Sequence, residues 1–174
     1  MKQKNLGFTL IEMMIAIVML VIVMTVAIPS MQSTIQNNRI SGLTNELSSS
    51  LNLARSEAIK RGVSVSICAA NASFNGCSNN WGTGWLIFVN PDENATFANN
   101  ASEVLLRVHQ VTGQGVTITT TPNVQVATYN SAGFAAVGSN VNFRIRASGC
   151  TGNNARNIAI SLTGRLSTTQ VACP

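Results

Sequence analysis

The chain has 174 residues, a length that suits a single domain. Charged residues make up only 10% of it, against roughly 25% in an average soluble protein, and there is one histidine. This shortage of acid–base groups argues against most enzymes, so we predict a non-enzymatic protein that uses no cofactor and no metal. The formal net charge of +5 keeps an anionic partner in consideration.

The first predicted element is an apolar helix over residues 8–28. Its only polar residues are Thr9, Glu12 and Thr25. At about 1.5 Å per residue it spans roughly 30 Å, the thickness of a bilayer's hydrocarbon core. Lys2 and Lys4 precede it, which by the positive-inside rule keeps the N-terminus cytoplasmic and exports residues 29–174. A cleaved secretory signal is the alternative, but its apolar core is shorter, about 7–15 residues.

A carboxylate lies inside this apolar run, because Glu12 is four residues into it. Ionisable residues are expensive there, with Asp, Lys or Arg costing about 2.5–3.5 kcal/mol at the centre of a membrane helix. We therefore expect Glu12 either to find a cationic partner or to reach the water interface.

Residues 2–12, KQKNLGFTLIE, carry a family resemblance. A basic leader ends in Gly7, Phe8 follows, and Glu12 is the fifth residue after that glycine. This pattern resembles the class III signal of type IV pilins and type II secretion pseudopilins. The resemblance implies that a prepilin peptidase removes residues 1–7 and methylates the new amine of Phe8. On a neighbouring subunit, that amine would be the cationic partner of Glu12 during filament assembly.

Pro29 follows the apolar run and matches the helix-kinking proline of that family, since proline removes a backbone donor. The helix is predicted to continue from Phe8 to Arg61, with Gly62 as its C-cap. The apolar stripe of its second half is Ile40, Leu43, Leu47, Leu51, Ala54 and Ala58. We expect this stripe to pack on the protein's own sheet, because the charge pairs of a coiled coil are absent.

Beyond Gly62, apolar and polar residues mostly alternate, which predicts strands separated by Gly, Asn and Pro. The predicted strands are 63–69, 84–89, 104–111, 116–121, 124–129, 141–147 and 157–169, the last folded as a hairpin about Thr163-Gly164. One long helix and many short antiparallel strands define an α+β fold. The most loop-like stretches are 71–80 and 90–102.

Four cysteines allow three pairings. We favour Cys68–Cys77, which closes a short loop, and Cys150–Cys173, which ties the C-terminal tail to the strands. Each bond stabilises a domain outside the cytosol by about 2–4 kcal/mol. Zinc is disfavoured, because the chain has no CxxC and its histidine is far from both pairs.

Three further segments resemble the GspH/FimT subfamily of pilin-like proteins. They are residues 54–62 (ARSEAIKRG) leading into the 63–68 strand, residues 81–85 (WGTGW) and residues 161–165 (SLTGR). The resemblance implies the type IV pilin fold, with the long N-terminal helix packed on an antiparallel sheet domain. It implies a single-pass inner-membrane protein with a periplasmic domain that moves to the pilus tip on assembly.

The same resemblance implies partners and a function. It favours a FimU-like minor pilin of a type IV pilus, which contacts other minor pilins and the major pilin and primes pilus assembly. The alternatives are the H-type minor pseudopilin of a type II secretion system and a FimT-like competence pilin that binds DNA in natural transformation.

The chain carries no acid after residue 103, while five arginines remain there. Arg144 and Arg146 are two apart in a predicted strand and therefore project from the same sheet face. With Arg156 and Arg165 they form a candidate patch for DNA phosphates, the alternative being ordinary solubilising arginines.

FimT-like pilins carry a G-R-x-R element for DNA binding. Here the corresponding residues are Gly164-Arg165-Leu166-Ser167, so the second arginine is missing. This departure favours the structural minor pilin over the DNA receptor.

Overall fold

The computed structural model describes residues 7–98, 100–112, 115–136 and 141–173. Helix α1 (Leu10–Arg61) is followed in these residues by strands, as the residue pattern predicts. The strands are β1 (Val65–Ala69), β2 (Gly84–Val89), β3 (Leu105–Gln110), β4 (Val116–Thr121), β5 (Val126–Tyr129), β6 (Asn142–Ala147), β7 (Ala155–Ile160) and β8 (Leu166–Val171). The α+β fold and the C-terminal hairpin are therefore confirmed.

Both ends of α1 have local causes. At its start, the backbone N–H of Glu12 donates to the hydroxyl oxygen of Thr9 at 3.3 Å, an N-cap contact. At its end, Lys60 and Arg61 occupy the last turn, and Gly62 has a φ of +65°. Glycine adopts this left-handed conformation without strain and stops the helix, which confirms the predicted C-cap.

The chain divides into two compact units, Met1–Asn38 and Arg39–Pro174. In the first unit, the large apolar side chains of α1 are exposed. Among the residues described, no helix combines the length and the hydropathy needed to cross a membrane. The boundaries predicted for the leader (1–7), the apolar helix (8–28) and the exported part (29–174) stay predictions.

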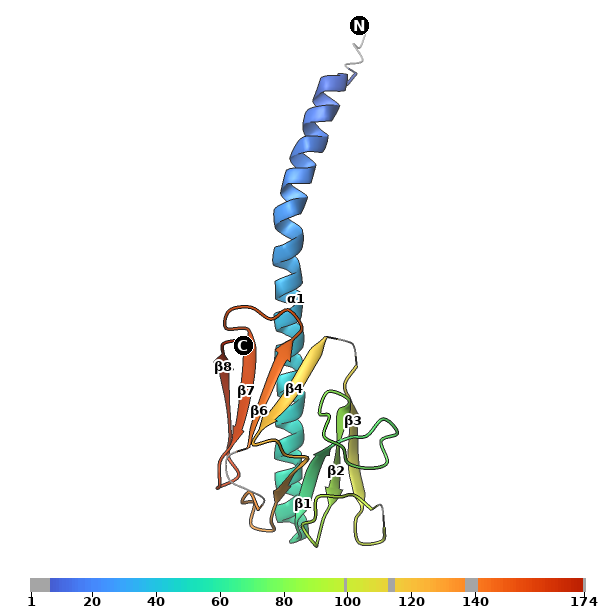
Figure 1. Cartoon of the computed structure of the whole chain (residues 1–174), viewed down its shortest axis with the longest axis vertical. Helices are drawn as coiled ribbons and strands as arrows, with labels where there is room; N and C mark the ends of the chain where they lie inside the picture. Colours follow the sequence, from blue (N-terminus) through green and yellow to red (C-terminus); the bar gives the residue numbers. More distant parts are fainter. Residues whose placement is uncertain (1–6, 99, 113–114, 137–140, 174) are drawn as a thin grey trace, which may run out of the picture. The chain divides into compact units, whose positions relative to one another are not determined.

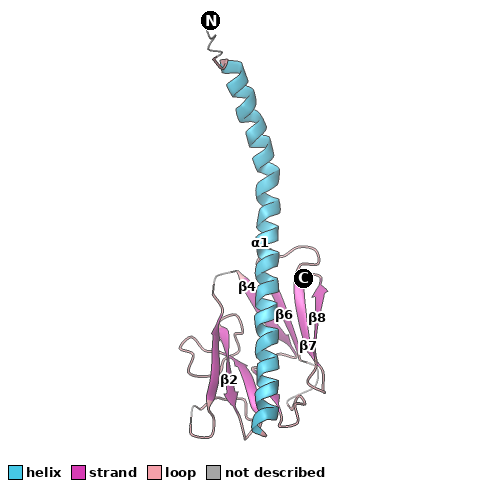
Figure 2. Cartoon of the chain, turned by 180° about the vertical axis from the view of Figure 1, so that it is seen from behind, coloured by secondary structure: helices cyan, strands magenta, loops and turns pink. Residues whose placement is uncertain are grey.

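The strands of the second unit form two antiparallel four-stranded sheets, with the orders β3-β2-β1-β5 and β4-β6-β7-β8. Figures 1 and 2 show the C-terminal half of α1 lying along both sheets, seen from opposite sides. The division into two sheets is not predicted from the sequence, because a residue pattern within one strand does not state which strands pair.

The predicted apolar stripe of α1 is buried against these sheets. Each of its six residues is at most 7% exposed, and all six share one core cluster with side chains of both sheets. Trp81 links the sheets: it follows β1, its ring packs edge-on against Phe143 of β6 with centroids 4.8 Å apart, and its Nε1 donates to the carbonyl of Val124. The stripe therefore packs on the protein's own sheets, as expected.

A second cluster lies on the other face of the first sheet. Strands β1 and β2 are buried on both faces, because loop residues cover the side away from α1. Phe97, in the loop after β2, packs on Phe88 with ring centroids 4.8 Å apart, and Phe74 and Cys77 of the loop after β1 add to the cluster. The two stretches predicted as loops are therefore structural cover for the sheet.

Candidate assembly and binding sites

The predicted processing site lies just before α1. Gly7 and Phe8 are not helical, and the Phe8 side chain is 75% exposed. A peptidase must bind the backbone next to the bond that it cuts, which a helix prevents and a non-helical exposed residue such as Phe8 permits. The geometry at Gly7–Phe8 is therefore suited to cleavage, and the cleavage itself stays a prediction.

Glu12 is in the first turn of α1, and its side chain is exposed. An acid at this position is stabilised by the positive end of the helix dipole. With Thr9 as N-cap, Glu12 occupies the third helical position, the T-x-x-E spacing of a capping box. This local role is separate from the two predicted for Glu12, a cationic partner or contact with the water interface, although the Thr9-Leu10-Ile11-Glu12 spacing signals it.

Helix α1 continues through Pro29 rather than ending there. Since proline has no N–H, the carbonyl of Thr25 loses its usual helical donor. The assembly role assigned to Pro29 stays a prediction.

Both expected disulfides are present. Cys68 in β1 is bonded to Cys77 in the loop that follows, with Cα atoms 5.6 Å apart. Cys150, after β6, is bonded to Cys173, after β8, with Cα atoms 5.7 Å apart. The second bond ties the C-terminal tail to the second sheet, as predicted.

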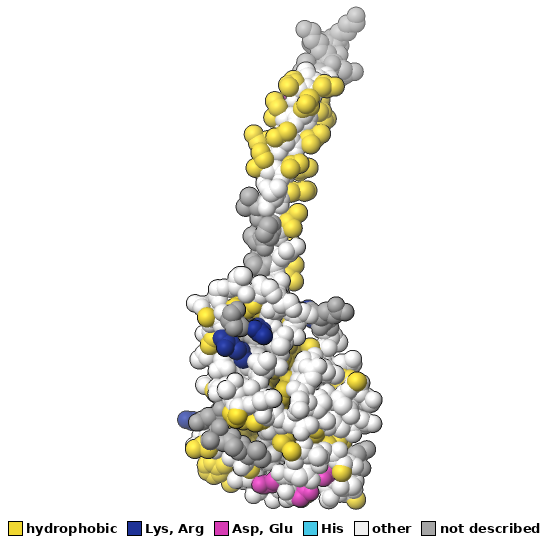
Figure 3. Space-filling model, in the orientation of Figure 1, with side chains coloured by type: hydrophobic (Ala, Val, Ile, Leu, Met, Phe, Trp, Pro, Cys, Tyr) yellow, Lys and Arg dark blue, Asp and Glu magenta, His cyan; other side chains and the backbone are white. Residues whose placement is uncertain are grey.

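The candidate DNA-binding arginines are only partly brought together. In β6, residues of odd number are buried while Arg144 and Arg146 are partly exposed, so these two share the outer face of the second sheet. Figure 3 shows Lys or Arg side chains gathered on this face. The guanidinium of Arg144 also donates from Nη2 to the carbonyl of Ala172 in the tail, at 2.6 Å.

Arg156 and Arg165 do not join that pair. Arg156 pairs directly with Ile145, which is fully buried, and opposite residues of an antiparallel ladder share a face. Arg165 lies in the turn before β8, four residues from Thr169, the β8 residue in the cross-strand row of Arg144. That is about 13 Å along the strand. A single patch of four arginines is therefore not present, and DNA binding by these residues stays a prediction.

The ARSEAIKRG segment has a structural role at the end of α1. Arg55 donates from Nε to the carbonyl of Gly133 at 2.9 Å and from Nη2 to the carbonyl of Thr163 at 3.0 Å. One guanidinium thus holds two loops against the helix.

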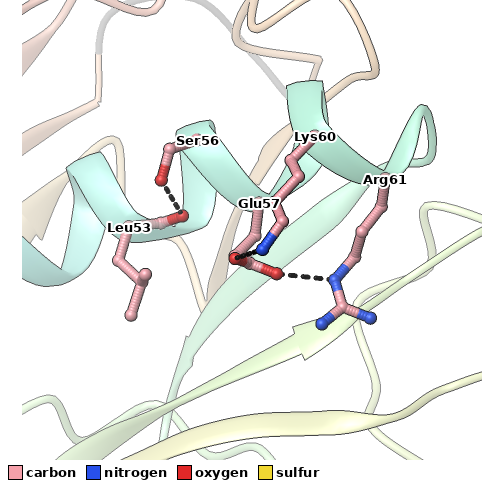
Figure 4. A network of polar contacts seen from close by, with 5 residues as sticks. All are labelled: Leu53, Ser56, Glu57, Lys60 and Arg61. Carbon is pink, nitrogen blue, oxygen red and sulfur yellow. Dashed lines mark hydrogen bonds and ion pairs between the residues drawn. The ribbon is translucent and has the colours of Figure 1, made fainter.

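Figure 4 shows the remaining polar contacts of this helix end. Glu57 pairs with Arg61 at 2.6 Å and with Lys60 at 3.7 Å. The hydrogen bond from Arg61, helped by both positive charges, holds the pKa of Glu57 below its usual value. The charges of this segment therefore stabilise the helix end, where cations also complement the helix dipole.

The WGTGW segment contacts His109. Trp85 is fully buried and stacks on His109, its cross-strand partner, with ring centroids 4.1 Å apart. His109 Nε2 in turn lies 3.2 Å from a carboxylate oxygen of Glu46 on α1. The histidine therefore links the first sheet to the helix.

The fold defines the class, an N-terminal helix packed on antiparallel sheets, and two family motifs agree with it. Residues 43–164 match the family described as type II transport protein GspH, and residues 2–28 match the prokaryotic N-terminal methylation motif. This chain belongs to the GspH family. Its members are structural proteins of pilin type, which implies a membrane-anchored pilin with an exported domain that assembles with other pilins.

Solved structures agree with this fold. The type IV minor pilin FimU of Pseudomonas aeruginosa (strain PAO1) is similar in two crystal forms. One has a TM-score of 0.61 and 24% identity over 76% of this chain and 89% of FimU, and the other 0.57 and 25% over 74% and 91%. The solution structure of GspH from E. coli has a TM-score of 0.51 and 16% identity, covering 78% of this chain and 90% of GspH. No curated protein matches the sequence significantly.

Proposed function

We propose that this chain is a minor pilin of a type IV pilus that takes part in the initiation of assembly and lies at or near the pilus tip. One observation carries the proposal. The first part of α1 exposes large apolar side chains on every side, from Leu10 to Ile28. A helix that is apolar all round must be buried elsewhere, in a bilayer or among other helices. A filament core supplies such a place after the inner membrane has supplied it first.

The start of α1 supports the same proposal. Cleavage after Gly7 by a prepilin peptidase would leave a charged amine at Phe8, and Glu12 presents its carboxylate one turn further along the helix. Among packed apolar helices, an unpaired Glu12 is costly, while pairing with the amine of a neighbour offsets that cost. The pair would therefore set the register of each incoming subunit.

The test is incorporation into filaments in cells that lack the chromosomal gene. We expect Glu12→Ala to be cleaved normally but to disappear from the sheared pilus fraction. Glu57→Ala, which removes an acid at the other end of α1, is the matched control and should be incorporated. Normal incorporation of Glu12→Ala would show that the docking role is wrong.

The second candidate is a minor pseudopilin of a type II secretion system. The observation that favours it is the match of residues 43–164 to the GspH family. Deleting the gene separates the two candidates. Loss of surface pili with normal protein secretion supports the minor pilin, and the reverse result supports the pseudopilin.

A further inference from the structure

The exported unit carries a pocket beside α1 that none of the family motifs explains. Its volume is about 230 Å³. It lies between α1 and the residues that follow β3, and is lined by Arg39, Gly42, Leu43, Glu46, Val111 and Thr112. We call it the Gly42 pocket.

Gly42 is the unusual residue in it. Glycine is the weakest helix former after proline, and Gly42 lies well inside α1. Its φ is not in the left-handed region, and a Cβ built on it would meet no atom within 4 Å. The fold of this chain therefore has no need of glycine here. The absence of a side chain at Gly42 leaves the floor of the pocket open.

The charges at the rim are already used within the chain. Arg39 donates from Nη2 to the carbonyl of Thr112 at 3.0 Å. Glu46 pairs with His109, which stacked Trp85 holds in place. Because both side chains already have partners within the chain, the pocket is poorly suited to a free ion. The unused surface is the half-buried Val111 beside the bare backbone of Gly42, with a small contribution from Leu43, which is 7% exposed.

We propose that the Gly42 pocket receives one bulky apolar side chain of an adjacent pilin subunit. The volume suits it, since an apolar cavity of about 150 Å³ holds a benzene ring. An adjacent subunit is the occupant because the pocket is on α1, the same helix whose apolar first part requires neighbours. The inference rests on the proposed function, and it adds a specific contact by which the exported unit recognises its neighbour.

The experiment fills the pocket with a larger side chain at position 42. Full-length chains with Gly42→Ala, Gly42→Leu and Gly42→Phe are produced in cells that lack the wild-type gene, and the subunit is quantified in sheared pili. We expect Gly42→Ala to be incorporated normally and the two larger variants to fall at least tenfold. Asn52→Leu adds the same bulk at an exposed position of α1 outside the pocket and should behave as wild type.

Thermal unfolding of the same full-length chains in detergent separates docking from folding. Alanine is a better helix former than glycine, so Gly42→Ala should melt above wild type. Gly42→Leu should not melt below it, because the space is open. A large drop would mean that the chain fills its own pocket, and the proposal would be wrong.

Two further results complete the test. A photo-crosslinking side chain at Thr112 should give an adduct with another pilin subunit, and the adduct should vanish when Gly42→Phe is added. If Gly42→Phe is incorporated as well as Asn52→Leu, the pocket is not a docking site. Absence of the wild-type chain from sheared pili would instead contradict the proposed function.

Discussion

At the residue scale, Arg55 connects two of the family motifs, the ARSEAIKRG segment at the end of α1 and the SLTGR turn before β8. Arg55 bonds the carbonyls of Gly133 and Thr163, and Gly164 stands beside both. A Cβ on Gly164 would collide with the Gly133 carbonyl, and its φ of +73° is one that side chains rarely adopt. The glycine of the SLTGR segment is therefore required for this close approach, while Arg165 beside it is exposed.

Replacing Arg55 by lysine should test this junction. A lysine keeps the charge but cannot present two forked donors, so one carbonyl loses its partner. We expect Arg55→Lys to lower the free energy of unfolding by about 1–3 kcal/mol. Arg61→Lys is the control, because an exposed ion pair is worth about 0–1 kcal/mol. Urea unfolding measures both, and equal effects would contradict the assignment.

Tyr129 is a second residue with a measurable consequence. It is 1% exposed, and within the described residues its hydroxyl has no hydrogen-bond partner. Burial raises the pKa of Tyr129 above its usual value. An unpartnered buried hydroxyl is destabilising, so Tyr129→Phe should raise the free energy of unfolding by about 1 kcal/mol at pH 7.

The same substitution should change the response to alkali. Because the folded state holds the phenolic proton more tightly, its stabilisation is complete below about pH 10 and is lost as the pH rises further. Wild type should therefore lose stability above that pH more steeply than Tyr129→Phe. The chain has one tyrosine, so tyrosinate absorbance follows this group alone. Ionisation at the ordinary pH in the folded protein would contradict its burial.

At the element scale, the two disulfides hold a loop and the C-terminal tail to the two sheets. Cys68–Cys77 closes a loop over the outer face of β1 and β2. Cys150–Cys173 spans 23 residues, and Cys173 also donates its N–H to the carbonyl of Gly152. The second bond places the tail where the carbonyl of Ala172 accepts a hydrogen bond from the guanidinium of Arg144.

Removing the second disulfide should reveal that coupling. In the loop-entropy account, Cys150→Ser with Cys173→Ser lowers the free energy of unfolding by about 3 kcal/mol. Once the tail is released, Arg144→Gln should cost less than it does in the oxidised chain. Arg146→Gln is the control on the same strand and should cost the same in both backgrounds. Denaturant unfolding of the four combinations gives the coupling energy, and strict additivity for Arg144 would contradict it.

At the scale of the whole molecule, one helix and one tryptophan make a shared core for two sheets. The stripe of α1 contacts both, and Trp81 reaches from the first sheet to Phe143 of the second. The polar residues of the strands that do not join this core face outward and form a surface with few charges. Among the residues that the structure describes, Arg144 and Arg146 form a basic pair on the outer face of the second sheet.

This arrangement predicts how the full-length chain in detergent would bind DNA. With two arginines on one face, the logarithm of the binding constant should fall with the logarithm of salt concentration with a slope of about −1.8. Arg144→Gln with Arg146→Gln should abolish that dependence, and Arg156→Gln should leave it unchanged. A gel-shift titration at several salt concentrations measures the slope. A much steeper slope would mean that more than two basic side chains contact the DNA, which would contradict the two-arginine patch.

Much of this protein follows from local patterns in its sequence. The three- and four-residue spacing from Ile40 to Ala58 predicts the buried face of α1, and Gly62 predicts its end. The mostly alternating pattern beyond Gly62 predicts the strands, and the positions of the cysteines favour the observed pairing. The helix and strand patterns depend on residues a few positions apart, which is why the order of residues alone predicts them.

Other features were decided only by the tertiary structure. Register put Arg156 on the face of Ile145 and away from Arg144, and packing brought Glu46, His109 and Trp85 together. The open floor at Gly42 exists only because α1 meets the chain after β3. The physical reason is that strand pairing and helix docking join residues far apart in the chain. Local periodicity states which face of an element is apolar, and only the packed fold decides what that face meets.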